Sequence, residues 1–353
     1  MPGAIRGHPG AARSAVCTGL GAGVTIRVAL AGDTMLGRGV GAQIAVAGPH
    51  SLFSAEVQEL FESADLALLN LECCVSDRGR PWEGPGKRFH FRAPPRAAEA
   101  LAYLGIDCVT LANNHSLDFG YTALSDTLDH LSGAEISAVG AGVDVEQARA
   151  PVLLEAGGLR VAVLGFTDHP AGFAAGPGQP GVAYADLGTG VPHWLGDQVR
   201  ALAASNDVVL VLPHWGPAMT THPLPYIRSA ARAVLNAGAT VVAGHSAHVF
   251  HGAAGRILYD LGDFVDDYAL DPALRNDLGL LFLVTVDSRG LQRVEAVPLK
   301  LEYAHTRLAD RNERAWIRAR LTRACAAFGT EVKEEDGLLV IERPGLEAPS
   351  ASS

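Results

Sequence analysis

Five apolar stretches of this chain each lead into polar side chains that can bind a metal ion. The donors are carboxylates, an amide and imidazoles, with no cysteine among them. Such oxygen and nitrogen donors suit Mn²⁺, Fe, Mg²⁺ or Zn²⁺ in a catalytic site rather than in a closed structural one. One such residue after an apolar stretch means little, but five in succession predict a metal centre. The residues are Asp33, Glu72, Asn114, His115, His214, His245 and His248.

The stretches that precede these donors have the composition of buried β-strands. They are rich in Val, Leu and Ile and do not alternate with polar residues, which is typical of strands covered on both faces in a parallel or mixed sheet. In such sheets the ligand site lies beyond the carboxyl ends of the strands. We therefore expect the donors to meet at one edge. The expected strands are 25–30, 67–71, 109–112, 208–212 and 240–243.

Helical and extended patterns alternate along the rest of the chain. Helical spacing predicts a helix over 51–63 with Ser51 as its N-cap. A basic Gly- and Pro-containing loop is expected over 79–95, and a Gly- and Pro-rich loop over 168–190. Hairpins are expected at Gly157-Gly158 and Asp336-Gly337. The other predicted helices are 96–104, 120–132, 191–205, 224–237 and 309–328, and the other strands are 151–156, 159–166, 256–260, 279–287 and 291–299.

The composition is that of a globular protein and argues against nucleic-acid binding. With 353 residues, of which 48% are hydrophobic and 19% charged, the chain can form a large core in one domain or two. Its formal net charge of −10 disfavours binding to a nucleic-acid backbone. The five cysteines show no C-x-x-C spacing and predict no disulfide framework. We therefore expect a cytoplasmic location, with an envelope-associated or secreted one as the alternative.

Both ends of the chain are predicted to be disordered tails. Residues 1–24 are rich in Gly and Ala and lack the continuous apolar segment of a secretion signal, so we find no convincing membrane anchor there. No stretch elsewhere is long and apolar enough to span a bilayer. Residues 344–353 form the second predicted tail. The sequence leaves the oligomeric state open.

Six short motifs occur in order between residues 32 and 264. They are Gly32-Asp33-Thr34-Met35-Leu36-Gly37-Arg38, Asn70-Leu71-Glu72, Ala112-Asn113-Asn114-His115-Ser116-Leu117-Asp118-Phe119-Gly120, His214-Trp215-Gly216, Gly244-His245-Ser246-Ala247-His248 and Leu258-Tyr259-Asp260-Leu261-Gly262-Asp263-Phe264. Together they resemble the CapA family of capsule or poly-γ-glutamate synthesis proteins, within the calcineurin-like metallophosphoesterase superfamily. The resemblance implies an α/β (α+β) fold: a two-sheet β-sandwich flanked by helices, in four αββα layers. It implies a domain over 25–305, with 306–343 as a C-terminal helix and hairpin packed on it.

The resemblance also implies a centre of two divalent ions, which would be Mn, Fe, Zn or Mg. Asp33 and His248 would bind the first ion, and Glu72 would bridge both. The second ion would be held by Asn114, His214 and His245. His115 would face the substrate as a general acid or transition-state stabiliser, and Asp118 would orient its imidazole.

Some residues depart from the usual metallophosphoesterase pattern. Met35 stands where the first motif usually has histidine, which leaves the first ion one ligand short, and Glu72 stands in place of the usual bridging Asp. Asp263 would either supply the missing acidic ligand or lie behind the ligands. Asp168 and His169 also follow a predicted strand, but their place in a loop gives them no assigned role.

An anionic or peptide-like small molecule is the expected substrate. Three arginines would bind the carboxylate or phosphate of this substrate or, equally, form a solvated surface. Trp215 would lie beside the site and contact the substrate. These arginines are Arg38, Arg88 and Arg92.

The favoured function is a metal-dependent hydrolase acting on a phosphoester or a glutamyl- or peptide-like amide. It would serve capsule or poly-γ-glutamate-type biosynthesis, or a peptide or small-molecule pathway. Metal-assisted acyl transfer or cyclisation of a glutamyl- or peptide-like substrate is one alternative. A non-catalytic capsule-assembly accessory protein is the other.

Overall fold

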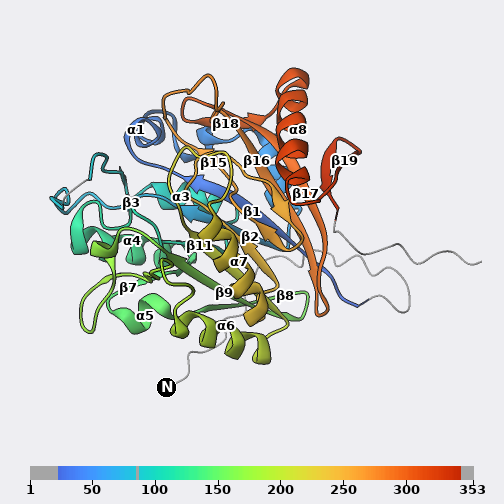
Figure 1. Ribbon diagram of the computed structural model, residues 1–353. Coiled ribbons are helices and arrows are strands. Elements are labelled where there is room, and N and C mark those ends of the chain that lie inside the picture. The colour runs from blue at the N-terminus through green and yellow to red at the C-terminus, as the bar shows by residue number, and fades with distance from the viewer. Residues whose placement is uncertain (1–22, 85–86, 343–353) are drawn as a thin grey trace, which may run out of the picture.

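Two large mixed sheets form the centre of the protein, whose computed structural model describes residues 23–84 and 87–342 (Figure 1). The predicted tails 1–24 and 344–353 fall outside these residues except for Gly23 and Val24, which belong to no helix or strand. The mixed α/β class with two main sheets is confirmed.

The larger sheet has ten strands, which come from residues 26–139 and 263–341. Its order is β19-β20-β17-β16-β1-β2-β5-β6, with β15 also paired to β1 and β18 to β17. The β15, β2, β5 and β6 pairings are parallel, and those of β16 to β20 are antiparallel. The strands are β1 Ile26–Thr34, β2 Leu66–Leu71, β5 Cys108–Thr110, β6 Ser137–Val139, β15 Asp263–Val265, β16 Leu278–Asp287, β17 Gly290–Glu302, β18 His305–Leu308, β19 Val332–Glu335 and β20 Leu338–Ile341.

The second sheet has six strands in the order β13-β14-β12-β11-β9-β8. Strands β9, β11, β12 and β14 run parallel, while β8 joins β9 through the predicted Gly157-Gly158 hairpin. These strands are β8 Val152–Ala156, β9 Leu159–Thr167, β11 Val208–His214, β12 Val241–Ala243, β13 Ala253–Ala254 and β14 Ile257–Leu258. Two short pairs lie apart: β3 Cys74–Val75 with β4 Arg92–Ala93, and β7 Ala141–Gly142 with β10 Gly181–Val182.

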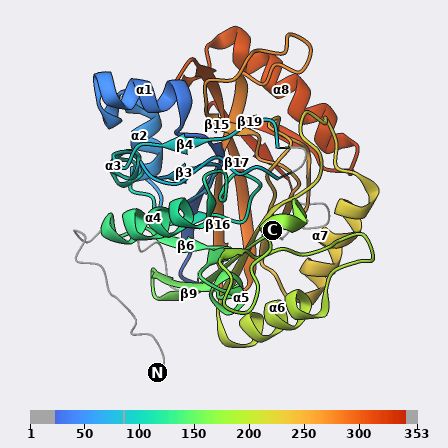
Figure 2. The same ribbon diagram turned by 90° about the vertical axis from the view of Figure 1, so that its left-hand side faces the viewer.

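Helices cover the outer faces of both sheets. Figure 2 shows α1 to α4 on one side of the strands and α6 and α7 on the other. The helices are α1 Arg38–Ala47, α2 Ala55–Glu62, α3 Ala97–Tyr103, α4 Gly120–Gly133, α5 Val145–Arg149, α6 His193–Ser205, α7 Pro225–Ala237 and α8 Arg311–Ala326, with 3-10 turns η1 Pro49–Leu52 and η2 Ala171–Phe173.

Strand periodicity explains the layers. Alternate residues of a strand point to opposite faces of its sheet. In β1, Val28 and Leu30 pack between the two sheets against Val163 and Leu210, whereas Ala29 packs against the helices on the outer face. The residues Leu164, Val209 and Val211 face the other way, toward α6 and α7. The four layers therefore follow from two buried faces on each sheet.

Three local predictions were wrong. Ser51 lies within η1, and the cap of α2 is Ser54, whose hydroxyl accepts a hydrogen bond from the Val57 N–H at 3.4 Å. Pro49 favours the separate 3-10 turn because its fixed φ suits a helical start. The strand predicted over 256–260 is only Ile257–Leu258, and the predicted loop 168–190 contains η2 and β10.

Candidate metal centre

The carboxyl ends of the parallel strands converge on a buried acidic cluster. Asp33 lies one residue before the end of β1, opposite Asp263 of β15 and Asn70 of β2, and Glu72 follows β2 directly. His248 comes from the turn after β12. Ligand atoms of Asp33, Glu72, His248 and Asp263 all lie within 4.8 Å of one another. This cluster fits a metal ion by its donor types and spacing.

Within the cluster His248 is the central imidazole. Its Nδ1 lies 2.8 Å from Asp263 Oδ1, 3.5 Å from Asp33 Oδ2 and 3.8 Å from Glu72 Oε2. The backbone of His248 has a φ of +58°, and that of Ser246 a φ of +109°. These strained left-handed conformations turn the segment after β12 back toward the cluster.

Two further imidazoles contact the other oxygens of Glu72 and Asp33. His214 Nε2 is 3.3 Å from Glu72 Oε1, and His245 Nδ1 is 3.2 Å from Asp33 Oδ1. An isolated parallel bridge pairs His214 with His245, because β11 and β12 end side by side. The two histidines therefore approach the same acids from the six-stranded sheet.

Several buried donors in this region have no hydrogen-bond partner among the described residues. They are Glu72 Oε2, Asn114 Oδ1, His214 Nδ1, Asp263 Oδ2 and His245 Nε2. A buried polar atom without a partner costs about 1–3 kcal/mol, so such a concentration needs an explanation. Metal binding would account for it, because carboxylate, amide and imidazole atoms of these types can act as metal ligands.

Burial and mutual repulsion shift the pKa values of the acids. Burial raises the pKa of Glu72 well above its usual range, and the Asp33 charge adds to this effect. Burial likewise raises the pKa of Asp263, with Asp266 as the next contributor. Burial also opposes ionisation of Asp33, but His245 and the other imidazoles outweigh it and lower the Asp33 pKa. A bound cation would relieve the repulsion that remains.

Two asparagines that we did not single out hold the first acid in place. The Asn70 amide donates to Asp33 Oδ1 at 2.8 Å, and the Asn113 amide donates to Asn70 Oδ1 at 2.9 Å. Asn113 Oδ1 in turn accepts from the His115 N–H at 2.9 Å. Their position in the sequence next to predicted ligands could have identified them, because such neighbours commonly orient metal ligands.

The Asp118 carboxylate contacts the imidazole of His115. His115 Nδ1 lies 2.6 Å from Asp118 Oδ2, and its Nε2 lies 3.9 Å from Glu72 Oε1. Phe91 stacks on the ring with centroids 4.0 Å apart. Burial lowers the His115 pKa well below its usual value, with Lys87 as the next cause. His115 thus directs Nε2 toward the acidic cluster.

Lys87 is the residue that sequence reasoning missed in this part of the site. Its Nζ contacts Asp118 Oδ1 and the Asn114 carbonyl oxygen, each at 2.5 Å, and lies 3.1 Å from His115 Nδ1. Burial lowers the Lys87 pKa, while Asp118 acts to raise it. Burial raises the pKa of Asp118 to about 7, and Lys87 counteracts this shift. The only advance signal was its place in the basic loop.

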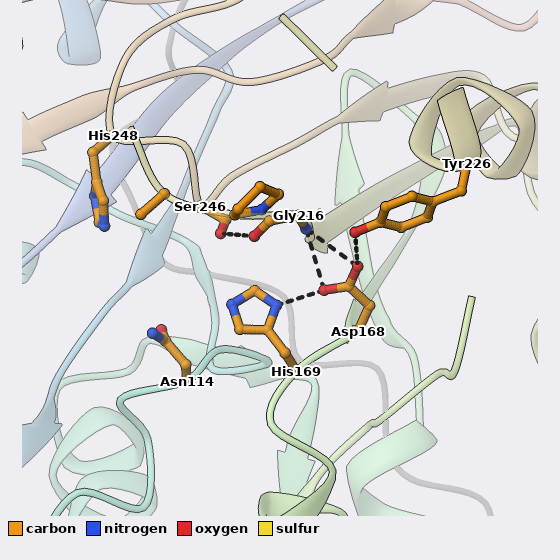
Figure 3. A pocket seen from close by; sticks show the side chains of 9 residues that line it. Asn114, Asp168, His169, Gly216, Tyr226, Ser246 and His248 are labelled. Atoms are coloured by element: carbon orange, nitrogen blue, oxygen red, sulfur yellow. Dashed lines mark hydrogen bonds and ion pairs between the residues drawn. The ribbon is translucent and has the colours of Figure 1, made fainter. Parts of the chain in front are cut away.

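A pocket of about 470 Å³ adjoins the acidic cluster (Figure 3). Asn114 and His248 line it on the side of the cluster, and Asp168, His169 and Tyr226 line the other side. It gives a small molecule access to the buried donors.

The predicted substrate-binding residues occupy different environments. Arg38 pairs with Asp267 and lies over the rings of Phe91 and Tyr268, at 5.0 and 5.5 Å from their centroids. The exposed Arg88 and the half-buried Arg92 do not line the pocket, and Arg92 lies 4.2 Å from the Phe119 ring centroid.

Trp215 lies behind the ligands rather than in the opening. It is 2% exposed, and its Nε1 donates to the Tyr259 carbonyl oxygen at 3.0 Å. The ring packs in the core on the outer face of the six-stranded sheet, with α6 and α7. Its role toward a substrate stays a prediction, as do those of the three arginines.

Within the described residues, no helix combines the length and apolarity that a bilayer crossing requires. The four cysteines in this part of the chain are buried and unpaired. They are Cys73, Cys74, Cys108 and Cys325.

The chain is similar to proteins of known families and structures. Residues 27–268 match the family described as "Bacterial capsule synthesis protein PGA_cap". A "Probable polyglutamine synthesis accessory protein" of Mycobacterium tuberculosis is 32% identical over 302 residues, covering 79% of this chain and 77% of the relative. The "PGA biosynthesis protein CapA" of Bacillus subtilis is 29% identical over 281 residues, covering 77% of this chain and 71% of the relative. A hypothetical protein from Thermus thermophilus aligns with a TM-score of 0.41 at 14% identity, covering 80% of this chain and 96% of that structure.

Proposed function

This chain belongs to the bacterial capsule synthesis protein family PGA_cap, and we propose that it is a metal-dependent hydrolase. Its substrate would be a phosphoester or a glutamyl- or peptide-like amide in capsule or poly-γ-glutamate-type synthesis. The names of the Mycobacterium and Bacillus relatives support the pathway. The observation that carries the proposal is the set of buried, unpartnered donors beside an oriented histidine.

The donors divide into two groups that share Glu72. Asp33, Asp263 and His248 would hold one divalent ion with Glu72, and these four residues already have ligand atoms within 4.8 Å of one another. A second ion would be held by Asn114, His214 and His245 together with Glu72, whose Oε1 lies 3.3 Å from His214 Nε2. Bound divalent cations supply Lewis acidity that polarises a phosphoryl or carbonyl oxygen.

The protein's own part in the reaction falls mainly to His115. Asp118 accepts a hydrogen bond from Nδ1, which fixes the ring tautomer and leaves Nε2 to take or give a proton. Lys87 neutralises the Asp118 charge and donates a hydrogen bond to the Asn114 carbonyl oxygen. It thereby fixes the position of Asp118 relative to Asn114. Phe91 excludes water from one face of the ring by stacking on it.

The arrangement of the donors also supports a relationship to metallophosphoesterases. They extend from the carboxyl ends of parallel strands in two facing sheets, which is where the predicted αββα fold would carry its ions. The domain limit at residue 305, the number of ions and the cytoplasmic location stay predictions.

Metal analysis and turnover assays on the purified full chain test this function. We expect close to two divalent ions per chain, and Mn²⁺-dependent turnover within a panel of phosphoesters and γ-glutamyl amides. His115→Ala should abolish turnover and keep the metal, whereas Asp33→Ala should lower the metal content. His222→Ala, at an exposed histidine, is the matched control. A protein that binds no divalent metal, or that turns over equally well without His115, would refute the proposal.

A second candidate is the accessory role named for the Mycobacterium relative. Full metal loading with no turnover of any panel member would favour it over hydrolysis.

A further inference from the structure

The pocket beside the acidic cluster contains a second Asp–His pair that the proposed chemistry does not use. His169 Nδ1 lies 2.5 Å from Asp168 Oδ1. The His169 side chain is 36% exposed and reaches into the pocket, whereas that of Asp168 is only 8% exposed. Figure 3 shows the other ring nitrogen directed away from Asp168, toward the side where Asn114 and His248 are drawn.

Asp168 is held so that it can only accept hydrogen bonds. Its carboxylate receives the Tyr226 hydroxyl at 2.9 Å and the Gly216 N–H at 3.2 Å, in addition to the His169 ring. Because an ionised carboxylate has no hydrogen to donate, the Nδ1 of His169 carries the proton of their hydrogen bond. A neutral His169 ring therefore presents Nε2 as a hydrogen-bond acceptor.

His169 Nε2 makes no hydrogen bond within the part of the chain that the structure describes. Its ring is tilted at 45° to that of His214, with centroids 5.1 Å apart, which places it beside the donors of the acidic cluster. The acceptor is thus oriented, accessible and close to the centre, but it has no partner among the described residues.

The charge of the pocket indicates which part of a substrate fits there. Among the described residues that line it, one is a carboxylate, Asp168, and none is lysine or arginine. Lys87 and Arg38 are paired elsewhere, with Asp118 and with Asp267. At His169 an anionic oxygen would meet the lone pair of Nε2, which offers it no hydrogen, whereas an N–H donor would find an acceptor there.

We propose that His169 is a substrate-contacting residue that accepts the N–H of a glutamyl-type amide, with Asp168 and Tyr226 as its positioning residues. This rests on the proposed hydrolase function and narrows its substrate from phosphoester or amide to amide. Asn114 and His248 line the pocket and also belong to the proposed metal centre, so an amide bound at His169 would lie next to that centre.

The test compares γ-glutamyl-glutamate with its ester analogue, in which oxygen replaces the amide N–H. Binding is measured by calorimetric titration at low temperature with Mn²⁺ present, and the ligand is checked for cleavage afterwards. The wild-type chain should bind the amide at least about fivefold more tightly than the ester. His169→Ala should weaken amide binding by about fivefold to thirtyfold and remove the preference, with metal content unchanged.

The Asp168→Asn variant tests whether Asp168 acts by orienting the His169 ring or only by stabilising the fold. The Asn amide can donate to Nδ1, which moves the ring proton to Nε2 and turns the acceptor into a donor. This variant should also lose the amide preference while it keeps its metal and its fold. His222→Ala should behave as the wild type.

Each other outcome overturns the inference in a recognisable way. An amide preference that survives in His169→Ala would overturn it and leave the hydrolase function intact. Loss of metal in His169→Ala would overturn it by assigning the ring to the metal centre. A wild-type chain that binds neither ligand would overturn the inference together with the glutamyl substrate of the proposed function.

Discussion

Replacing Glu72 with glutamine should have opposite effects on the metal-free and metal-loaded protein. Glu72 is fully buried, and its carboxylate lies within 4.8 Å of the nearest ligand atoms of Asp33 and Asp263. Glutamine keeps the shape and the Oε1 acceptor beside His214 but removes one of the charges. Without metal that change relieves repulsion, and with metal it removes a ligand charge.

The magnitude follows from the spacing. Two unit charges 4.8 Å apart repel by about 3.5 kcal/mol at an effective dielectric constant of about 20. The raised pKa of Glu72 means that the metal-free protein takes up a proton instead of bearing all of this repulsion. We therefore expect Glu72→Gln to stabilise the EDTA-treated protein by about 1–2 kcal/mol, or about 1–3 °C in Tm.

The metal response should change in the other direction. Mn²⁺ at about a hundredfold excess over its Kd adds about 2.7 kcal/mol of stability to a protein that binds it only when folded. A tenfold loss of affinity in Glu72→Gln would remove about 1.4 kcal/mol of that gain at the same Mn²⁺ concentration.

Thermal unfolding with EDTA and along a Mn²⁺ titration measures both effects. Glu59→Gln, at an exposed glutamate of α2, is the control and should leave both unchanged. A Glu72→Gln variant that is less stable than the wild type in EDTA would refute the electrostatic reasoning. An unchanged Mn²⁺ response would refute the assignment of Glu72 as a ligand.

Three further predictions concern the surroundings of the centre. Burial raises the Glu72 pKa above its usual 4.5, so the folded metal-free protein holds a proton that the unfolded chain releases. The stability of the metal-free protein should therefore fall as pH rises above about 4.5. Denaturant titrations with EDTA between pH 5 and pH 8 will show this fall or exclude it. Lys87→Met removes the partner of the buried Asp118 and should cost about 3–5 kcal/mol in urea unfolding, whereas a loss below about 1 kcal/mol would contradict the buried pairing. Gly32→Ala would place a Cβ 1.9 Å from the Gly262 carbonyl oxygen, so we expect reduced soluble yield and loss of metal, and normal metal content would count against the β1–β15 approach.

Much of the fold could be predicted from local pattern. The strand–helix alternation, the Gly157-Gly158 hairpin and the main strands of both sheets were expected, because buried strands and amphipathic helices carry their periodicity in a few consecutive residues. Helix α2 was missed at its start because Pro49 and Ser54 divide one helical pattern into a 3-10 turn and an α-helix, a choice made by competing local signals.

The donor residues themselves were also determined by the sequence. Asp33, Glu72, His214, His245 and His248 were identified because each follows a strand-like stretch, and parallel strands deliver such residues to one edge. That reasoning needs only the order of strands and donors, and no knowledge of which strand pairs with which.

Only the tertiary structure decided which side chains meet. Asp263 reaches Asp33 because β15 pairs with β1 in one particular register, and Lys87 reaches Asp118 because a long loop follows one course over the sheet. Asp168 and His169 form a pocket wall because β9 and β11 end together beside α7. Strand pairing and loop course depend on contacts between residues far apart in the chain. A local pattern of residues therefore names the candidate ligands, but the packing of the whole chain selects their partners.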